Sequence, residues 1–189
     1  MSGRILCEKV EAALLGGAKW IQYRDKSDDN KKRFNEATQL LEICKYHDGL
    51  LIINDDIELT KKIRAAGVHV GQDDAPVKQA REHLGSQFII GTTCHNSIEL
   101  AIHAQQQGAD YLAFGRFFPS KTKGQAEQAD LNILKTATES FHLPIIAIGG
   151  IDITNAKTAL IHGASTVAVC RALFDCDNVT LRAQQFLNL

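Results

Sequence analysis

One unit recurs along this chain of 189 residues, and it constrains the fold more than any other feature. In each copy, a stretch with helical spacing ends at or beside a glycine, and a short apolar run follows at once. Glycine after a helix favours a left-handed C-terminal cap, and an uninterrupted apolar run is typical of a strand buried on both faces. The four copies occupy residues 12–23, 63–71, 105–115 and 160–169.

Three further apolar runs lie between these copies, so the sequence predicts seven strands, each followed by a helical segment. Alternation of strands and helices, with strands that are apolar throughout, predicts a parallel sheet covered by helices. The expected strands are residues 20–23, 50–53, 68–71, 88–90, 111–115, 145–148 and 167–169.

Two architectures satisfy this pattern, an open doubly wound sheet and a closed barrel. No G-x-G-x-x-G or G-x-x-x-x-G-K motif follows a strand, so the fingerprints of nucleotide-binding folds are absent. Polar residues instead follow many different strands, which suits a barrel whose rim is assembled from all its loops. We therefore predict a single α/β domain over residues 1–189, a TIM (β/α)₈ barrel.

The beginning of the chain departs from a complete barrel. Residues 5–15 already have helical spacing, so we expect the first strand to be missing from this chain. Either a natural N-terminus precedes Met1, or residues 1–4 are a remnant of that strand. A seven-strand barrel would have two unpaired edges and an exposed interior.

Composition narrows the function classes. The net charge is −1, which provides no field for binding nucleic acid or an anionic membrane. The longest apolar runs are too short to cross a bilayer. The cysteines are odd in number and widely spaced, without a C-x-x-C pair, so we expect no disulfide framework, no thiolate zinc site and a reducing cytoplasm. They are Cys7, Cys44, Cys94, Cys170 and Cys176.

A candidate anion site follows the first predicted strand. Gln22, Arg24 and Lys26 alternate along the chain, and alternate residues of an extended strand point to one side. Two cations and an amide at a barrel mouth can bind an anion. The alternative is a solvated charged turn.

Acidic residues follow the next two predicted strands, within residues 54–56 and 71–74. Carboxylates from two neighbouring strand ends can share one Mg²⁺ ion, which takes one or two carboxylates and completes its shell with water and phosphate oxygens. The alternative for each pair is helix N-capping, and Asp56 and Asp73 are the residues for which capping is the competing interpretation.

The remaining predicted strand ends carry hydroxyls, cations and glycines. Thr93 can donate to a phosphate, whereas His95 is either an acid–base group or structural. Residues 115–124 form a long loop that suits a lid over a polyanionic substrate. Gly149 and Gly150 can bind phosphate through backbone N–H groups, and Cys170 and Arg171 open a short helical segment at the last predicted strand.

Taken in order, these motifs resemble the thiamine-phosphate synthase family along nearly the whole chain. The family's Q-x-R-x-K is similar to residues 22–26, its N-D to 54–55, its G-V-H-L-G-Q-x-D to 67–74, its G-x-S-x-H to 91–95 with Thr93 for serine, its F-P-T-x-T-K to 118–123, and its A-I-G-G-I to 147–151.

The resemblance implies that hydroxymethylpyrimidine diphosphate is joined to hydroxyethylthiazole phosphate, with release of pyrophosphate. It implies that Asp55 and Asp74 hold Mg²⁺ and that Arg24, Thr93 and Lys123 act in catalysis. The implied substrate contacts are Gln22, Arg24, Lys26, Asn54, Thr93, Ser120, Thr122, Lys123, Gly149, Gly150, Cys170 and Arg171.

Some departures leave alternatives open. The family usually has a serine near Arg171, and the arginine can either bind the thiazole phosphate or obstruct it. A thiazole tautomerase-like relative would use His95 to move protons without a metal. A non-catalytic barrel would bind a phosphate ligand without turnover. The oligomeric state is also open, with a homo-oligomer among the alternatives.

Overall fold

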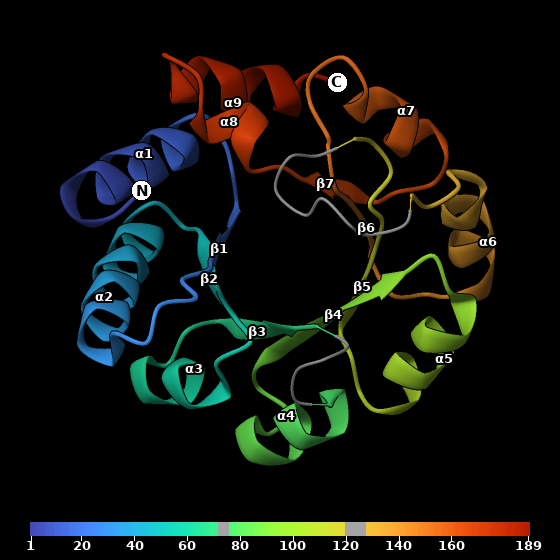
Figure 1. Ribbon diagram of the computed structural model, residues 1–189, viewed down its shortest axis with the longest axis horizontal. Helices are drawn as coiled ribbons and strands as arrows, with labels where there is room; N and C mark the ends of the chain where they lie inside the picture. Colours follow the sequence, from blue (N-terminus) through green and yellow to red (C-terminus); the bar gives the residue numbers. More distant parts are fainter. Residues whose placement is uncertain (72–75, 120–127) are drawn as a thin grey trace.

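The computed structural model describes residues 1–71, 76–119 and 128–189. Within these ranges the strands form a ring, and the helices surround it (Figure 1). No helix in these ranges is long and apolar enough to cross a bilayer. The strands are β1 (Trp20–Tyr23), β2 (Leu50–Asn54), β3 (Gly67–Val70), β4 (Ile89–His95), β5 (Tyr111–Phe114), β6 (Ile145–Ile148) and β7 (Thr166–Ala168). The helices are α1 (Gly3–Leu15), α2 (Asn30–Tyr46), α3 (Ile57–Ile63), α4 (Val77–Leu84), α5 (Ile98–Gln106), α6 (Asn132–Ser140), α7 (Ala156–Ile161), α8 (Arg171–Phe174) and α9 (Val179–Leu187).

The sheet is parallel throughout, and its strands follow one another in chain order from β1 to β7. Neighbouring sequential strands with helices outside are the arrangement of a (β/α) barrel. In the described part of the chain β1 and β7 pair with no further strand, and the chain enters α1 at Gly3 without a preceding strand. The prediction of a TIM-type barrel that lacks its first strand is confirmed, and we call the gap between β1 and β7 the seam.

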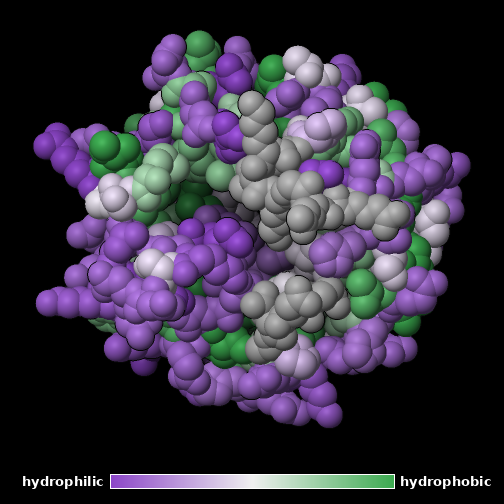
Figure 2. Space-filling model, in the orientation of Figure 1, coloured by the Kyte–Doolittle hydropathy of each residue, from purple (hydrophilic) through white to green (hydrophobic). Residues whose placement is uncertain are grey.

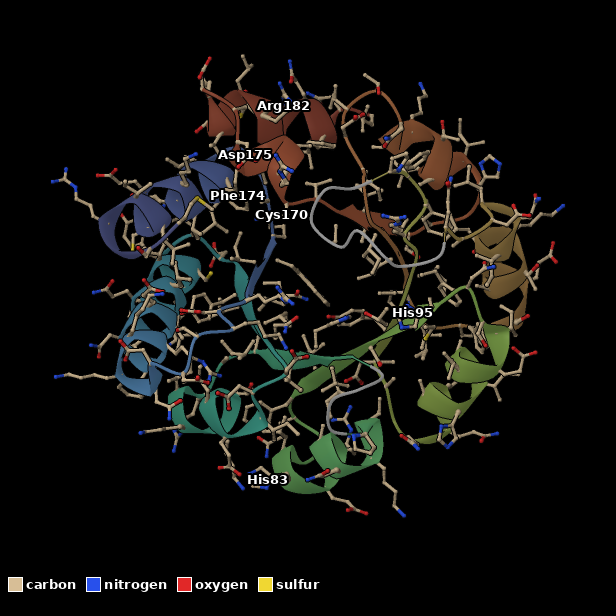
Figure 3. All side chains as sticks on the ribbon, viewed as in Figure 1. His83, His95, Cys170, Phe174, Asp175 and Arg182 are labelled. Atoms are coloured by element: carbon tan, nitrogen blue, oxygen red, sulfur yellow. The ribbon has the colours of Figure 1, made fainter. Side chains whose placement is uncertain are left out.

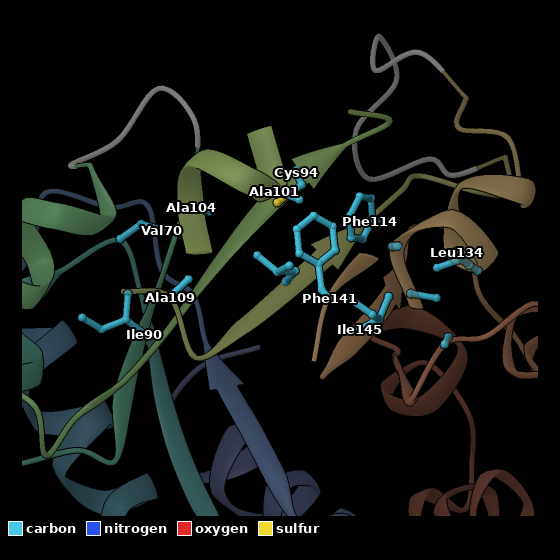
Figure 4. Close-up of a cluster of buried hydrophobic side chains, with 14 of the residues drawn as sticks. Val70, Ile90, Cys94, Ala101, Ala104, Ala109, Phe114, Leu134, Phe141 and Ile145 are labelled. Atoms are coloured by element: carbon cyan, nitrogen blue, oxygen red, sulfur yellow. The ribbon is translucent and has the colours of Figure 1, made fainter. Parts of the chain in front are cut away.

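The core lies between the sheet and the surrounding helices. Along β1, exposed and buried residues alternate, because successive side chains of a strand point to opposite faces. The face toward the helices is buried on both sides of the ring, and Figure 4 shows part of this layer. On the β3 to β6 side, this layer includes Val70, Ile90, Phe114, Leu134 and Ile145.

The other face of the sheet lines the interior of the ring, and its burial depends on distance from the seam. Tyr111, Ala113 and Ile146 are buried together on β5 and β6. Trp20 on β1 remains 44% exposed, although its ring lies 5.5 Å from that of Tyr111 between centroids. The first and last residues of β7 are exposed as well. The interior is therefore open along the seam, as an incomplete barrel requires.

Helices α1 and α9 pack against each other outside the seam. A Cβ atom on Gly16 would lie 2.5 Å from Ala183 Cβ and 2.5 Å from the carbonyl oxygen of Thr180, so only glycine permits this approach. The Thr180 hydroxyl donates to the carbonyl oxygen of Ala12 at 3.0 Å. The first and last helices thus connect the two edges of the sheet, which no strand pairing connects in the described residues.

Gly67 does not form the predicted helix cap. Helix α3 ends at Ile63, and its C-cap is Arg64, which adopts the left-handed conformation with φ 56°. Gly67 instead begins β3, where a Cβ atom would lie 2.0 Å from the carbonyl oxygen of Ile89 on β4. The glycine serves the close approach of two strands, whereas Gly85, the C-cap of α4, has a positive φ of 83°.

Strand β4 is longer than the predicted strand 88–90. Residues 91–95 lie within it, not after it, and a bulge interrupts the pairing with β5 between Thr93 and His95. The sequence pattern underestimates the length of this strand because the two threonines interrupt the apolar run. Their side chains nevertheless alternate in the manner of a strand, since Thr92 donates to the carbonyl oxygen of Val70 on one face and Thr93 meets His69 on the other.

The exposure of Trp20 makes the open seam measurable. Trp20 is the single tryptophan of the chain, so fluorescence reports this position alone. We expect acrylamide to quench its emission readily, because the indole is 44% exposed. Quenching as weak as that of a fully buried indole would contradict an open seam, and the urea-unfolded chain provides the upper reference.

Candidate functional site

The predicted site residues that the structure describes lie in or just after the carboxyl ends of the strands. In the view of Figure 2, hydrophilic residues dominate this side of the molecule, and a hollow beside the grey residues has hydrophobic surface within it. The described residues are Gln22, Arg24, Lys26, Asn54, Asp55, Thr93, Gly149, Gly150, Cys170 and Arg171. Four more predicted residues, Asp74, Ser120, Thr122 and Lys123, lie outside the described residues.

The ends of β1 and β2 meet at Asp55. The Lys26 ammonium and the Asn54 side-chain amide both contact Asp55 Oδ2. Asp55 is in the left-handed region with φ 64°, and its backbone N–H donates to the His69 carbonyl oxygen at 2.8 Å. Left-handed backbone is tolerated by aspartate and asparagine better than by most residues. The structure thus brings three predicted residues together around one carboxylate.

The carboxylates beside this cluster have structural partners on α2. Asp56 contacts the Arg33 guanidinium, and its Oδ1 accepts a hydrogen bond from the Leu59 N–H at 2.8 Å. Asp56 is therefore the N-cap of α3, and the capping interpretation is confirmed for this residue. It leaves Asp55 as the member of the acidic pair that faces the Lys26 and Asn54 side chains.

Asp25 holds the turn that carries the two predicted cations. Its carboxylate accepts a hydrogen bond from Lys32 Nζ at 2.7 Å and another from the Ser27 N–H at 2.8 Å. The Lys32 hydrogen bond, with the Ser27 bond second, lowers the pKa of Asp25 to about 2. Asp25 is thus charged at neutral pH, and its two bonds fix the chain between Arg24 and Lys26.

A buried hydrogen-bond network crosses three neighbouring strands below Asp55. His69 on β3 lies between Thr93 on β4 and Tyr111 on β5. Its Nε2 is 2.9 Å from Thr93 Oγ1, and its Nδ1 is 2.8 Å from Tyr111 Oη. All three residues are less than 9% exposed, so these hydrogen bonds satisfy polar atoms that lie away from water.

The Tyr111 ring reaches His69 because Gly91 has no side chain. A Cβ atom on Gly91 would lie 1.8 Å from Tyr111 Cζ, so the ring occupies that space. The same ring stacks on the His69 imidazole with 5.5 Å between centroids and meets the Trp20 ring edge to face. Burial raises the pKa of Tyr111 well above its ordinary value, so the phenol keeps its proton.

Two glycines after β6 leave room for the segment that follows β5. Gly149 and Gly150 have φ values of 89° and 69°. Cβ atoms on them would lie 2.2 Å from Arg116 Cβ and 2.3 Å from the Phe118 carbonyl oxygen, respectively. The Phe118 N–H donates to the Gly149 carbonyl oxygen at 3.0 Å. The loops after β5 and β6 are therefore packed together at the rim.

Cys170 and Arg171 lie beside the seam. Cys170 is exposed and precedes α8, and the Arg171 guanidinium pairs with Asp175 at 3.0 Å between Nε and Oδ2. Arg171 also borders a cavity of about 530 Å³ between α8 and α9, whose lining includes none of the other predicted site residues that the structure describes. Figure 3 shows Cys170, Asp175 and Arg182 near α8 and α9, with His95 elsewhere on the ring. In the described part of the chain, the Arg171 guanidinium therefore pairs with Asp175 and not with Asp55.

The described residues include no group of three or more histidine, cysteine, aspartate or glutamate side chains that could hold a metal ion. Asp55 alone among the predicted ligands is described, because Asp74 lies outside the described residues. Its carboxylate is a hard oxygen donor and already attracts a cation, Lys26. The donor chemistry of Asp55 is thus suited to Mg²⁺, which binds few carboxylates and keeps its own waters.

Sequence reasoning assigned no role to His69 and Tyr111. His69 lies inside a strand of valine and glycine, and Tyr111 opens an apolar run, so both fit an ordinary buried strand. The available signal was a single polar residue in an apolar strand, since buried histidines need hydrogen-bond partners. The partners themselves come from other strands and could not be identified from spacing.

Comparisons with known proteins agree with one another. The family model described as thiamine monophosphate synthase matches residues 1–173. A thiamine-phosphate synthase of Saccharophagus degradans is 50% identical over 184 residues, which are 97% of this chain and 85% of the relative. A thiamine-phosphate synthase of Alcanivorax borkumensis is 46% identical over 183 residues, 95% of this chain and 84% of the relative. The solved structure of a thiamine phosphate pyrophosphorylase from Pyrococcus furiosus superposes with a TM-score of 0.89 at 31% identity, covering 96% of this chain and 87% of that chain.

Replacing Lys32 by methionine should raise the pKa of Asp25 from about 2 toward the ordinary value near 4. Because the folded pKa lies below the unfolded one, the Asp25 interactions stabilise the fold above about pH 4 and lose that effect as the pH falls toward about 2. NMR titration of the Asp25 carboxyl carbon measures this change. Lys78→Met, at an exposed lysine, is the control, and an Asp25 that titrates near 4 in the unmodified protein would contradict the pairing.

Replacing Gly150 by alanine should destabilise the protein by about 2 kcal/mol or more, from left-handed strain and from overlap with the Phe118 carbonyl. Urea unfolding measures the loss. Gly3→Ala is the matched control, because Gly3 also has a positive φ, 57°, but nothing lies within 4 Å of its added Cβ. Equal effects of the two substitutions would show that the packing of the two rim loops contributes nothing.

Proposed function

This chain belongs to the thiamine-phosphate synthase family, a family of transferases, and we propose that it joins hydroxymethylpyrimidine diphosphate to hydroxyethylthiazole phosphate. The products are thiamine phosphate and pyrophosphate. The observation that carries the proposal is the cluster of Lys26, Asn54 and Asp55, which gathers two family motifs from β1 and β2 around one carboxylate.

The pyrimidine diphosphate binds at the ends of β1 and β2. Gln22 points into the ring from β1, and Lys26 and Asn54 lie together beside it. An ammonium and an amide can donate charge-assisted hydrogen bonds to diphosphate oxygens. Arg24 after β1 and Lys123 of the loop after β5 add two cations to the same site.

Asp55 and Asp74 are the residues that hold Mg²⁺ on the diphosphate. The contact of Asp55 with Lys26 supports this role, because it shows that the carboxylate lies where it can attract a cation. When bound, the ion supplies positive charge that offsets the charge gathering on the departing pyrophosphate. Lys26 is then available to the diphosphate oxygens themselves.

The reaction breaks the bond between the pyrimidine methylene carbon and a diphosphate oxygen, and pyrophosphate leaves with the electron pair. The aminopyrimidine ring stabilises the resulting cation, which the thiazole nitrogen then attacks to form the new carbon–nitrogen bond. Catalysis therefore needs cations and hydrogen-bond donors around the leaving group more than a general base. Arg24, Thr93 and Lys123 fill these roles.

The thiazole phosphate binds at the opposite loops of the rim. Gly149 and Gly150 follow β6, and in the described part of the chain the Gly150 N–H donates to no other group. Backbone N–H groups of the last barrel loops are suited to phosphate. Ser120 and Thr122 of the neighbouring loop contribute hydroxyls, and the Cys170–Arg171 step closes the site beside the seam.

We also place the protein in the cytoplasm. All five cysteines are free thiols in the structure, which is the usual state of cysteines in a reducing compartment. Both substrates and both products are small, charged molecules of central metabolism, and the proposal requires no membrane or nucleic-acid partner.

The decisive experiment supplies both substrates with and without Mg²⁺ and follows pyrophosphate and thiamine phosphate. Asp55→Asn should reduce turnover about 100-fold or more, because a neutral amide would hold Mg²⁺ less well than the carboxylate and less positive charge would offset the charge on the leaving group. Asparagine suits this test because it tolerates the left-handed φ of 64° at this position.

Asp177→Ala, at an exposed aspartate near α9, is the control and should retain turnover. A folded protein that forms no product with Mg²⁺ would overturn the proposal. Rearrangement of the thiazole phosphate without metal would instead identify a tautomerase, and binding without turnover would identify a ligand-binding barrel.

A further inference from the structure

We propose that Glu36 on α2 is a positioning residue of the diphosphate site, because it anchors the end of β1 and thereby orients Arg24 toward the ligand. Helix α2 lies outside the ring, beside β1 and β2 (Figure 1), so Glu36 acts through Tyr23 and not by contact with the substrate. The inference rests on the proposed function for the identity of the ligand. Glu36 belongs to none of the motifs at the strand ends.

Glu36 is a buried carboxylate that connects three elements. The residue is 6% exposed. Its Oε2 accepts a hydrogen bond from Tyr23 Oη at 2.8 Å, and its Oε1 accepts one from the Gly3 N–H at 2.8 Å. Burying a carboxylate is costly unless it is hydrogen-bonded, so the two bonds hold the start of α1 and the end of β1 against α2. Burial, followed by the bond to Glu36, raises the pKa of Tyr23, so the phenol remains a donor.

The Tyr23 anchor sets which residues after β1 face the ring. Exposed and buried residues alternate along β1, and Tyr23 is on the buried face toward the helices. The alternation continues beyond the strand, where Arg24 is exposed and Asp25 is half-buried. Asp25 pairs with Lys32 of α2, at 2.7 Å between carboxylate and ammonium. Successive residues of an extended chain point to opposite sides, so two neighbours held from outside direct Arg24 toward the ring.

The same side of α2 also holds the end of β2. Glu36 follows Lys32 by four residues and Arg33 by three, and residues at these spacings are neighbours on a helix surface. The Arg33 guanidinium contacts Asp56 after β2, while Lys32 binds Asp25 after β1. The two strand ends that supply the diphosphate site are therefore held by one face of one helix.

The charge of Glu36 distinguishes positioning from a direct electrostatic effect. A carboxylate repels a diphosphate, so removal of its charge would by itself strengthen diphosphate binding. Loss of the anchor has the opposite effect, because displacing a group at the site by about 1 Å can cost about 100-fold in rate. The direction of the change in Glu36→Gln therefore separates the two effects.

The first test measures KM for each substrate separately. Tyr23→Phe keeps the ring and removes the hydroxyl that binds Glu36. It should raise KM for the pyrimidine diphosphate about tenfold, with little change in KM for the thiazole phosphate. Glu36→Gln keeps the size of the side chain and should act in the same direction. A merely structural role would lower the stability to urea without separating the two substrates. Tyr46→Phe, at an 83% exposed tyrosine, is the matched control.

The second test asks whether the effect passes through Arg24. In an Arg24→Met background, Tyr23→Phe should change KM for the pyrimidine diphosphate less than about twofold, because the two residues act through one group. Calorimetry with inorganic pyrophosphate and Mg²⁺ provides a readout that needs no turnover. We expect binding about tenfold weaker in Tyr23→Phe than in the unmodified protein, and this difference should disappear in the Arg24→Met background.

The outcomes separate the inference from the proposed function. An equal rise in KM for both substrates, a lower KM for the pyrimidine diphosphate in Glu36→Gln, or equal effects of Tyr23→Phe with and without Arg24 would each overturn the inference. Pyrophosphate binding that weakens as expected, in a folded protein that forms no thiamine phosphate, would overturn the proposed function while supporting the role of Glu36. Turnover with a selective rise in KM for the pyrimidine diphosphate would support both.

Discussion

The packing of α1 against α9 is the contact on which this open barrel depends. A closed barrel is held by strand pairing around its whole circumference, but no pairing joins β1 to β7 in the described residues. Gly16 allows the two helices to approach until Thr180 bonds to the backbone of α1. The first and last helices of the chain therefore hold the two edges of the sheet near each other, and the arrangement of the mouth follows from that contact.

At the mouth of the barrel, glycines allow close contacts that other residues would prevent. Gly91 leaves room for the Tyr111 ring, and the glycine pair after β6 leaves room for the loop after β5. These spaces allow groups from different strands to approach more closely than two side chains would permit. The buried network and the packed rim loops both result. The three aspartates near the ends of β1 and β2 have different partners. Asp25 and Asp56 pair with Lys32 and Arg33 on α2, whereas Asp55 pairs with Lys26.

Much of the fold could be predicted because a buried strand requires a run of apolar residues that are neighbours in the sequence. Short apolar runs identify all seven strands, but for β4 the run covers only its beginning, because Gly91 and the two threonines interrupt the run without ending the strand. The cap at Asp56 was one of two readings of a local pattern, and the structure selects it. The prediction that Gly67 caps a helix was wrong, because the contact that requires a glycine there is with Ile89 on another strand.

The sequence by itself determined the alternation of strands and helices, the missing first strand and the family motifs at the strand ends. Each of these features depends only on residues that are close to one another in the sequence. Only the tertiary structure decided which groups meet. The contact of Lys26 with Asp55 and the network through His69 join residues from separate elements. Spacing along the chain carries no information on such contacts, because they arise from the curvature of the sheet and from how closely its strands and loops can approach.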